Sequence, residues 1–232
     1  ISGIAKGSGM IAPNMATMLS FIFTDANIPS VFLKSILKKI TATTFNSISI
    51  DNDMSTNDMV GIFATGKAKN SKLYNVLDPK LQDFEKALHR LCLNLAKQIV
   101  VDGEGAKKFI TIKVIGAKSI SMAKNIGFSI ANSPLFKTAI AGEDPNWGRI
   151  VMAIGKSGEN IVPNKVQIKI GDYLVAEQNM VAKDYNEKMI KKYMEWDSIQ
   201  IEVNLNIGNG SFTTYTCDFT HDYIDINADY RN

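Results

Sequence analysis

The sequence has only two cysteines, two histidines and no long apolar run, and each shortage excludes a class of protein. Cys92 and Cys217 fall in segments with a helix pattern and a strand pattern, which favours a reduced cytosolic protein over a disulfide-stabilised secreted one. Because no run approaches ~18 apolar residues, no membrane span is predicted. His89 and His221 have no Cys, Asp or Glu at metal-ligand spacing around them, so we expect surface or packing histidines and no metal site.

An excess of charge of one sign is also lacking. The 26 basic and 23 acidic side chains leave a net charge of +3, and the lysines are spread along the chain. Neither nucleic acid nor a membrane is therefore an expected partner. The composition is that of an ordinary globular protein, with 45% hydrophobic and 21% charged residues in a chain of 232. That length allows one or two domains with a core that needs no disulfide or metal.

The hydrophobic periodicity predicts a mixed fold. Strands and helices follow one another without regular βαβ alternation, which favours an α+β or layered α/β arrangement over a doubly wound sheet. We expect Asp144 to cap a helix and residues 208–210 to turn the last two strands into a hairpin. Strands are predicted at 17–24 (buried), 47–50, 60–65, 109–115, 166–170, 173–176, 199–205 and 212–219, and helices at 30–40, 81–101, 122–130, 134–140, 145–154 and 184–195.

Three segments resemble ligand-binding motifs only in part. Residues 61–68 fit the phosphate-loop pattern except for the final Ser or Thr, and residues 150–157 lack its first glycine. Residues 51–55 begin like a calcium loop, but Thr56 replaces the glycine of the sharp turn. We interpret 61–68 as a strand that ends in a turn. A nucleotide-binding protein that uses this segment is kept as a third hypothesis.

The segment from Lys6 to Leu19 joins a Gly-rich turn, a proline and a small residue to a strand headed by Thr17. A threonine hydroxyl is a weak nucleophile unless a base lies beside it, and an N-terminal threonine can use its own α-amine. The pKa of such an amine is about 8, close to working pH. The hydroxyl of Thr17 could also attack the carbonyl of Ala16. Taken alone, the segment fits a commonplace strand start better than a catalytic threonine.

Five separated segments share a pattern with a known family. They are GIAKGSGMIAPNMATML (3–19), DNDMSTND (51–58), VVDGEGAKKF (100–109), SIANSPLFKTAIAGEDPNWGRIVMAIGKSGE (129–159) and CDFTHDYIDINADYRN (217–232). Over its whole length the chain resembles the C-terminal part of the ornithine acetyltransferase family, the bifunctional glutamate N-acetyltransferases of arginine biosynthesis. Matches in this number and order are more specific than any single motif.

The resemblance implies a self-cleaving precursor cut between Ala16 and Thr17, with an acyltransferase fold of the N-terminal-nucleophile type. Residues 1–16 would then end an α chain, and residues 17–232 would form the β chain. N-acetylornithine would acetylate Thr17, and glutamate would take the acetyl group. No cofactor is implied, although acetyl-CoA is a possible substrate. The implied assembly is a cytoplasmic heterotetramer of two α and two β chains.

The resemblance also assigns substrate-binding roles. Lys6 would meet a substrate carboxylate, and Glu104 a substrate ammonium or the amine of Thr17. Asn227 matches a binding asparagine, and Asn232 stands where many relatives have Thr or Ser. Without the resemblance, Lys6 would be interpreted as a solvated loop lysine and Glu104 as an exposed turn residue.

Other parts of the pattern have no matched catalytic role. These are 55–58 and 142–149, where we interpret Asn146 and Trp147 as capping and packing residues. The alternation of polar residues and isoleucine over 224–227 fits either a tail that reaches the site or a plain edge strand.

Two rival functions remain open. In the family, the donors that stabilise the developing oxyanion come from residues upstream of Ile1, so the chain by itself could be a non-catalytic partner. An amidohydrolase, in which water takes the acyl group from an N-terminal threonine, differs only in water exclusion and acceptor binding.

Overall fold

The computed structural model describes residues 1–12, 18–54, 58–71 and 73–229. They form two compact units, Ile1–Asp102 (unit 1) and Gly103–Asn232 (unit 2), and both combine helices with a sheet, so the α+β prediction is confirmed. The division predicted at 16/17 concerns a single peptide bond, which lies outside the described residues. The elements are β1 Ser2–Lys6, β2 Leu19–Thr24, α1 Ser30–Thr41, the 3-10 helix η1 Phe45–Ser47, β3 Met59–Ala64, η2 Pro79–Leu81, α2 Gln82–Val101, β4 Phe109–Ala117, α3 Ile120–Ala131, α4 Pro134–Ala141, α5 Trp147–Lys156, η3 Pro163–Lys165, β5 Gln167–Ile170, β6 Tyr173–Glu177, β7 Met180–Val181, α6 Glu187–Met194, β8 Ser198–Asn204, β9 Gly210–Cys217 and α7 His221–Ala228.

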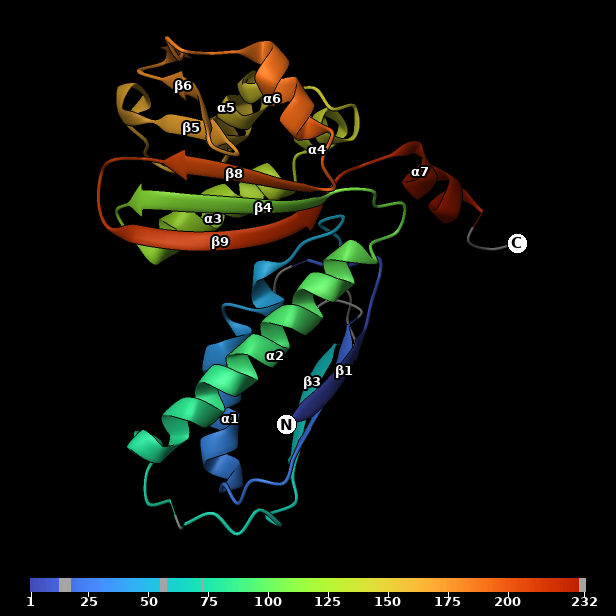
Figure 1. The fold of residues 1–232 in the computed structure, drawn as a ribbon, viewed down its shortest axis with the longest axis vertical. Helices are drawn as coiled ribbons and strands as arrows, with labels where there is room; N and C mark the ends of the chain where they lie inside the picture. The colour runs from blue at the N-terminus through green and yellow to red at the C-terminus, as the bar shows by residue number, and fades with distance from the viewer. Residues whose placement is uncertain (13–17, 55–57, 72, 230–232) are drawn as a thin grey trace. The chain divides into compact units, whose positions relative to one another are not determined.

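Unit 1 consists of a three-stranded sheet with α1 and α2 along one face (Figure 1). β2 lies in the middle, antiparallel to β1 and parallel to β3. Its side chains alternate: Ser20, Ile22 and Thr24 are buried, whereas Leu19 and Phe23 are exposed. The predicted strand is confirmed, and its burial holds for one face only, because the helices cover only one face of this sheet.

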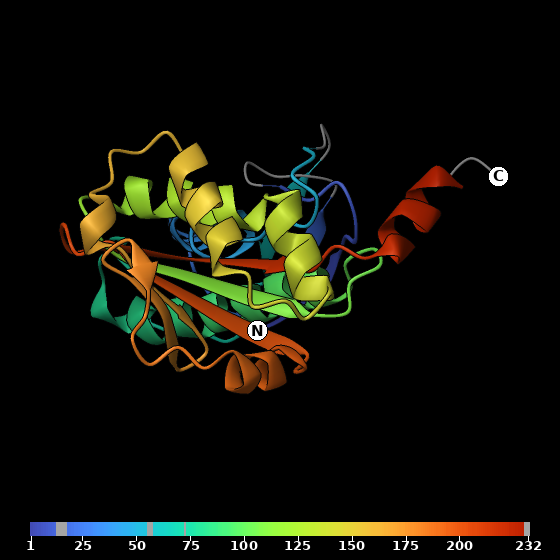
Figure 2. The same ribbon diagram turned by 90° about the horizontal axis from the view of Figure 1, so that it is seen from above.

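Unit 2 contains a six-stranded sheet in the order β7-β6-β5-β8-β4-β9. Seen from above, α3, α4 and α5 gather on one face of it (Figure 2). The core between them is formed by isoleucine and valine of the central strands and by Phe136 of α4. Every second residue of β4 faces this core, as its alternating sequence FITIKVI predicted.

The helices α3, α4, α5 and α6 of unit 2 begin at side-chain caps, whereas α7 does not. The hydroxyls of Ser119 and Ser133 accept hydrogen bonds from main-chain N–H groups at the starts of α3 and α4. At α5 the cap is Asn146, whose Oδ1 accepts from Arg149 N at 3.3 Å. The prediction that Asp144 is the cap was wrong by two residues, and the interpretation of Asn146 as a capping residue is confirmed.

The connection from β8 to β9 is not a hairpin. β4 lies between these two strands, parallel to β8 and antiparallel to β9. The chain crosses the end of β4, where Ile207 N donates to Gly116 O at 2.8 Å. A side chain on Gly208 would collide with Ala117 O, so the glycines predicted to form a hairpin turn serve this close crossing instead.

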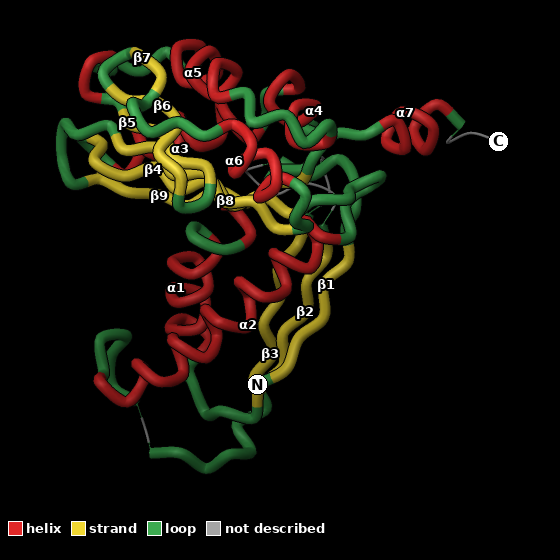
Figure 3. Tube along the Cα trace, turned by 45° about the horizontal axis from the view of Figure 1, so that its top comes forward, coloured by secondary structure: helices red, strands yellow, loops and turns green. Residues whose placement is uncertain are grey.

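Three further predictions fail locally (Figure 3). The strand predicted over 47–50 is not formed: Ser47 ends η1, Ile48 makes only an isolated bridge, and Ile50 N donates to Ile11 O at 2.8 Å. Residues 224–227 belong to α7 rather than to an edge strand. The strands β1 and β7 were not predicted: no strand was expected before residue 17, and β7 has only two residues.

Candidate functional site

The predicted cleavage site lies in the connection between two paired strands. β1 and β2 pair antiparallel from Ser2↔Phe23 to Lys6↔Leu19, so Lys6 sits at the end of β1 nearest to the connection. Thr17, the predicted nucleophile, and its neighbour Ala16 lie outside the described residues, as does Asn232.

Lys6 borders a cleft of about 410 Å³ within unit 1. One wall is the end of β1 and the turn that follows it, with Gly7 and Ser8, and the other is the last part of α2, with Gln98 and Asp102. The side chain of Lys6 is exposed. The cleft thus offers a cation on one wall and a carboxylate on the other, which suits a small zwitterion such as an amino acid.

Two carboxylates of the DNDMSTND segment hold the chain before and after residues 13–17. Asp51 accepts hydrogen bonds from the N–H groups of Met10 at 2.7 Å and Ile11 at 3.0 Å. Asp58 Oδ1 accepts from Met18 N at 2.6 Å. These contacts give Asp51 and Asp58 a structural role that the sequence pattern left open. They also make Asp51 unlike a calcium ligand, because its two oxygens accept from main-chain donors.

Asp58 has an unusual environment. Burial raises the pKa of its carboxyl, and the hydrogen bond from Met18 N–H opposes this effect in part. Its second oxygen, Oδ2, is buried and has no hydrogen-bond partner among the described residues. A buried polar atom without a partner is uncommon and is often found where a group takes part in chemistry.

In unit 2 the structure brings together two of the predicted binding residues. Asn227 Nδ2 donates to Glu104 Oε2 at 2.9 Å and to Tyr223 O at 3.0 Å. Glu104 is half-buried in the loop before β4, and Asn227 lies on α7. This contact places Glu104 and Asn227 next to each other in unit 2, whereas Lys6 belongs to unit 1.

Several contacts fix the Glu104 loop against the start of α7. Thr220 Oγ1 donates to Gly105 O at 2.7 Å, and Lys107 forms an ion pair with Asp222 at 3.0 Å. Gly105 has a φ of +70°, and a Cβ on it would collide with Tyr223 N. Asp218 Oδ1 accepts from the N–H groups of Lys107 at 2.8 Å and Lys108 at 2.9 Å. The loop is therefore a rigid support for Glu104.

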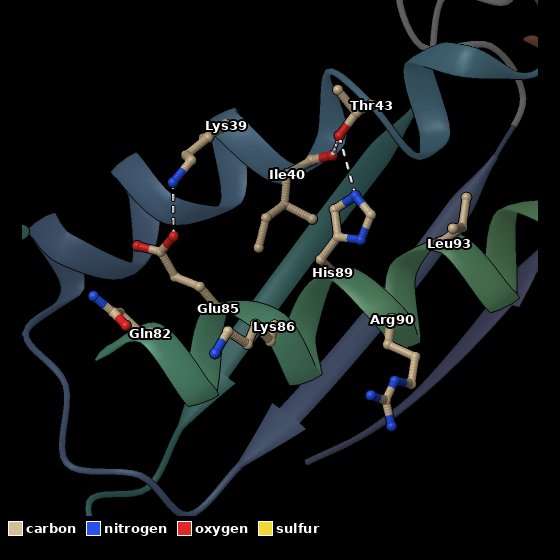
Figure 4. Close-up of a pocket in the computed structure, with 9 residues that line it drawn as sticks. All are labelled: Lys39, Ile40, Thr43, Gln82, Glu85, Lys86, His89, Arg90 and Leu93. Carbon is tan, nitrogen blue, oxygen red and sulfur yellow. Dashed lines mark hydrogen bonds and ion pairs between the residues drawn. The ribbon is translucent and has the colours of Figure 1, made fainter. Parts of the chain in front are cut away.

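A larger groove of about 620 Å³ lies between α1 and α2 and contains none of the predicted site residues (Figure 4). Lys39 pairs with Glu85 across it at 2.7 Å, and Thr43 Oγ1 lies 3.3 Å from His89 Nε2. His89 is therefore a helix-surface histidine with a hydroxyl partner, as predicted. Arg90 points away from α1.

Other predicted features can be placed in the same way. Cys92 on α2 and Cys217 on β9 are buried and form no disulfide. Residues 61–64 belong to β3, which confirms the strand interpretation of the first phosphate-loop-like segment. In the described parts of the chain, no three His, Cys, Asp or Glu side chains are grouped to hold a metal ion. Likewise, none of the described helices has both the length and the apolar character that crossing a bilayer requires.

Sequence reasoning missed Asp51, Asp58 and Asp218 as structural parts of the site. All three use a carboxylate to hold main-chain N–H groups, a role that leaves no periodic signal. The one available signal was their position inside segments already recognised as a pattern.

Comparison with known proteins gives a consistent result. The profile of the ArgJ family matches residues 1–232. The arginine biosynthesis bifunctional proteins ArgJ of Brucella melitensis and Gluconobacter oxydans are 51% and 50% identical to this chain and cover all of it, while the chain covers 57% and 55% of their lengths. It therefore spans little more than half of these curated relatives. The crystal structure of the arginine biosynthesis bifunctional protein ArgJ of Bacillus halodurans matches with a TM-score of 0.88 and 45% identity, over 91% of this chain and 99% of that one.

Proposed function

Because this chain belongs to the ArgJ family, we propose that it forms part of a glutamate N-acetyltransferase of arginine biosynthesis. The family resemblance found in the sequence is confirmed. In the proposed reaction the acetyl group passes from N-acetylornithine to Thr17 and then to glutamate. No cofactor takes part, and acetyl-CoA is an optional donor.

The observation that carries this proposal is the pairing of β1 with β2 on the two sides of residues 13–17. Cleavage between Ala16 and Thr17 would leave β1 attached to β2 by main-chain hydrogen bonds. Asp51 would still hold Met10 and Ile11, and Asp58 would still hold Met18. The arrangement therefore supports a cut chain whose residues 1–16 and 17–232 stay together.

The proposed chemistry uses the free α-amine of Thr17 as its base. As the bond between Thr17 Oγ1 and the acetyl carbon forms, the hydroxyl proton passes to this amine. As the acetyl C–N bond breaks, the same proton passes to the leaving amine of ornithine. Glutamate reverses the two steps with its own amine.

The substrate would be held through its charged ends. The cation of Lys6, at the edge of its cleft, suits the carboxylate that N-acetylornithine and glutamate share. Glu104, oriented by Asn227, suits an ammonium group. Asn232 is proposed as a further substrate-binding residue on the basis of the sequence alone.

The proposed partner is a further segment of the precursor, within a heterotetramer of two α and two β chains in the cytosol. The uncovered face of the unit 1 sheet supports a partner, because Phe23 and Phe63 are 48% and 50% exposed there and their rings stack at 5.4 Å. Exposed apolar patches of this kind are typical of interaction sites. Native mass spectrometry of the protein expressed from its full reading frame measures the stoichiometry.

Processing is tested on the same full-length protein by intact-mass spectrometry. We expect separate α and β chains with Thr17 at the start of the β chain, and a single uncut chain for Thr17→Ala. Thr17→Ser should still be cut because it keeps a hydroxyl, and Thr41→Ala on α1 is the matched control. An uncut wild-type protein would exclude the nucleophile assignment.

Transfer is tested with N-acetylornithine labelled in the acetyl group, with and without glutamate. We expect labelled N-acetylglutamate, and a labelled Thr17 peptide when glutamate is omitted. Release of labelled acetate at the same rate with and without glutamate would instead identify an amidohydrolase. A second assay with acetyl-CoA as the donor decides whether that substrate is used.

A further inference from the structure

Lys137 on α4 is a charged side chain inside unit 2 that the proposed chemistry does not use. The residue is 2% exposed, although lysine is rarely buried this completely. Its ammonium donates to Thr216 Oγ1 at 2.9 Å and to Cys217 O, and it lies 5.4 Å from the centre of the Phe219 ring. Residues 216–219, which link β9 to α7, therefore gather around one cation.

Stability alone does not explain an ammonium at this position. Burial of a charged group costs free energy that its hydrogen bonds offset only in part. An apolar side chain of similar volume is often equally stabilising in such a place. What the ammonium of Lys137 adds is a set of directed donors, which hold the carbonyl of Cys217 and the hydroxyl of Thr216 in one arrangement.

The segment that Lys137 holds supports the loop of Glu104. Asp218, in the middle of this segment, is 2% exposed. Its Oδ1 accepts from the N–H groups of Lys107 at 2.8 Å and Lys108 at 2.9 Å. A displacement of the main chain at Asp218 would therefore displace the loop that carries Glu104.

The same segment also supports Asn227 on α7. Phe219 N donates to Lys137 O at 3.4 Å, and the rings of Phe219 and Tyr223 lie 4.4 Å apart between their centres. Tyr223 O in turn accepts from Asn227 Nδ2 at 3.0 Å. The place of Phe219 therefore influences the place of the amide that contacts Glu104.

The residues after α4 provide a second anchor for the loop. Glu143 Oε1 accepts from Lys108 Nζ at 3.0 Å. Lys108 is 8% exposed, and its ammonium also donates to Met194 O at 2.8 Å. The chain over 137–143 is thus attached both to the segment 216–219 and to the loop before β4.

We propose that Lys137 is a positioning residue for substrate binding, whose ammonium fixes residues 216–219 and through them the mutual placement of Glu104 and Asn227. The inference rests on the proposed function, in which Glu104, oriented by Asn227, binds the ammonium group of N-acetylornithine. Lys137 needs no contact with the substrate for this role. The role also explains why a buried lysine stands in the sequence pattern at 129–159.

The test is Lys137→Met in the protein expressed from the full reading frame, because methionine keeps the length of the side chain and removes the donors. We expect the KM for N-acetylornithine to rise about 10-fold with kcat changed by less than about 2-fold, because a contact made equally in the ground state and the transition state contributes to KM alone. An enzyme that is only destabilised would show the opposite, a lower kcat from fewer active molecules and an unchanged KM.

Hydrogen exchange without substrate tests the placement itself. In Lys137→Met the N–H groups of Lys107 and Lys108 should exchange about 10-fold faster, because the carboxylate of Asp218 that binds them is no longer held in place. This measurement does not depend on acetyl transfer.

Two further variants complete the experiment. Thr216→Val keeps the shape of a buried side chain and removes one acceptor of Lys137, so it should raise the same KM by about 3-fold, and it carries the test if Lys137→Met does not fold. The matched control is Lys124→Met on α3. The ammonium of Lys124 also lies over aromatic rings, those of Phe128 at 5.7 Å and Phe212 at 5.6 Å, and its loss should change neither KM nor exchange at the loop.

Three results would overturn the inference: an unchanged KM in the folded variants, a lower kcat with an unchanged KM, or unchanged exchange at Lys107 and Lys108. The second would mean that Lys137 supports only the stability of the fold. Failure of the proposed function is a different result, in which the wild-type protein itself transfers no acetyl group. The exchange data would then still decide whether Lys137 holds the loop.

Discussion

The two sheets of the molecule carry different side chains on the faces that the helices leave open. In unit 2 the face opposite to α3 carries Lys113, Lys169 and Glu202 on three adjacent strands, with Nζ–Oε distances of 2.9 Å and 4.0 Å to Glu202. In unit 1 the corresponding face carries Phe23 and Phe63. Water can solvate the first face, whereas the second exposes aromatic surface.

This difference indicates that the sheet face of unit 2 is stable in contact with water, whereas the sheet face of unit 1 is suited to contact with another surface. Ion pairs on an exposed face add little stability, but they keep an open sheet face soluble. Stacked phenylalanines on such a face gain their full burial energy only when another surface covers them. The unit that carries the predicted cleavage site is thus also the one with a face suited to a partner.

The largest expected effect distinguishes a covered phenylalanine from an uncovered one. Phe136 in the unit 2 core is 1% exposed, and Phe136→Ala should cost about 3–5 kcal/mol of unfolding free energy. Phe63→Ala should cost about 1 kcal/mol or less in the isolated chain, because that ring is already half in water. Urea denaturation followed by circular dichroism measures both. Equal losses would show that Phe63 is as well covered as Phe136, and the contrast between the faces would disappear.

A smaller difference is expected between two glycines with the same backbone conformation, one in each unit. Gly66 and Gly105 both have a φ of +70°, so an alanine at either position costs about 1–2 kcal/mol from strain. At Gly66 the added Cβ finds only the Asn27 side chain, at 3.7 Å. At Gly105 it collides with the main chain of α7, so the loss should exceed that of Gly66→Ala by about 1–3 kcal/mol.

Hydrogen exchange shows where the glycine effects act. Gly105→Ala should increase exchange at the N–H groups of Lys107 and Lys108, which Asp218 binds in the native loop. Gly66→Ala should leave that loop unchanged. Similar exchange in both variants would mean that the Glu104 loop is not held by its approach to α7.

Elements with a regular local pattern could be predicted from the sequence, and their arrangement could not. The amphipathic pattern of 81–101 corresponds to α2 within one residue, and FITIKVI corresponds to β4. The order β8-β4-β9 is decided by pairing between distant segments. The five residues 205–209 are long enough either for a hairpin or for a crossing of one strand, about 10 Å, so the sequence did not distinguish them.

The site residues show the same distinction between a recognisable sequence pattern and a long-range contact. Glu104 and Asn227 were proposed as binding residues through the family resemblance alone, and the 2.9 Å contact between them could not be read from the sequence. Asp58 was not identified, because a carboxylate that binds a main-chain N–H 40 positions away has no sequence signature. Likewise, TMLSFIFT carries apolar residues on both faces of the strand, so the sequence does not reveal which face is covered.

Replacing the exposed phenylalanines by a polar residue tests whether the unit 1 sheet face binds a partner, with little change in stability. Phe23→Ser combined with Phe63→Ser should reduce binding of an apolar fluorescent dye to the isolated chain and weaken its association with the remaining precursor segment. The matched control is Lys113→Ser with Glu202→Ser on the unit 2 face. Stability should change by less than about 1 kcal/mol in both pairs. Unchanged dye binding in the phenylalanine pair would remove this face as an interaction surface.

The smallest expected effect compares two carboxylates that hold main-chain N–H groups, Asp58 in unit 1 and Asp218 in unit 2. Burial raises the pKa of Asp58 above 3.8, so its folded form favours the proton, and stability falls as pH rises through that raised pKa. Asp58→Asn should therefore be more stable than the wild type at pH 7, and the gain should vanish as the pH falls below about 4. Asp218→Asn weakens two charge-assisted hydrogen bonds and should lose about 1 kcal/mol at pH 7. Thermal unfolding between pH 3 and pH 8 measures both, and a loss of stability in Asp58→Asn at pH 7 would mean that its carboxylate serves the fold rather than the reaction.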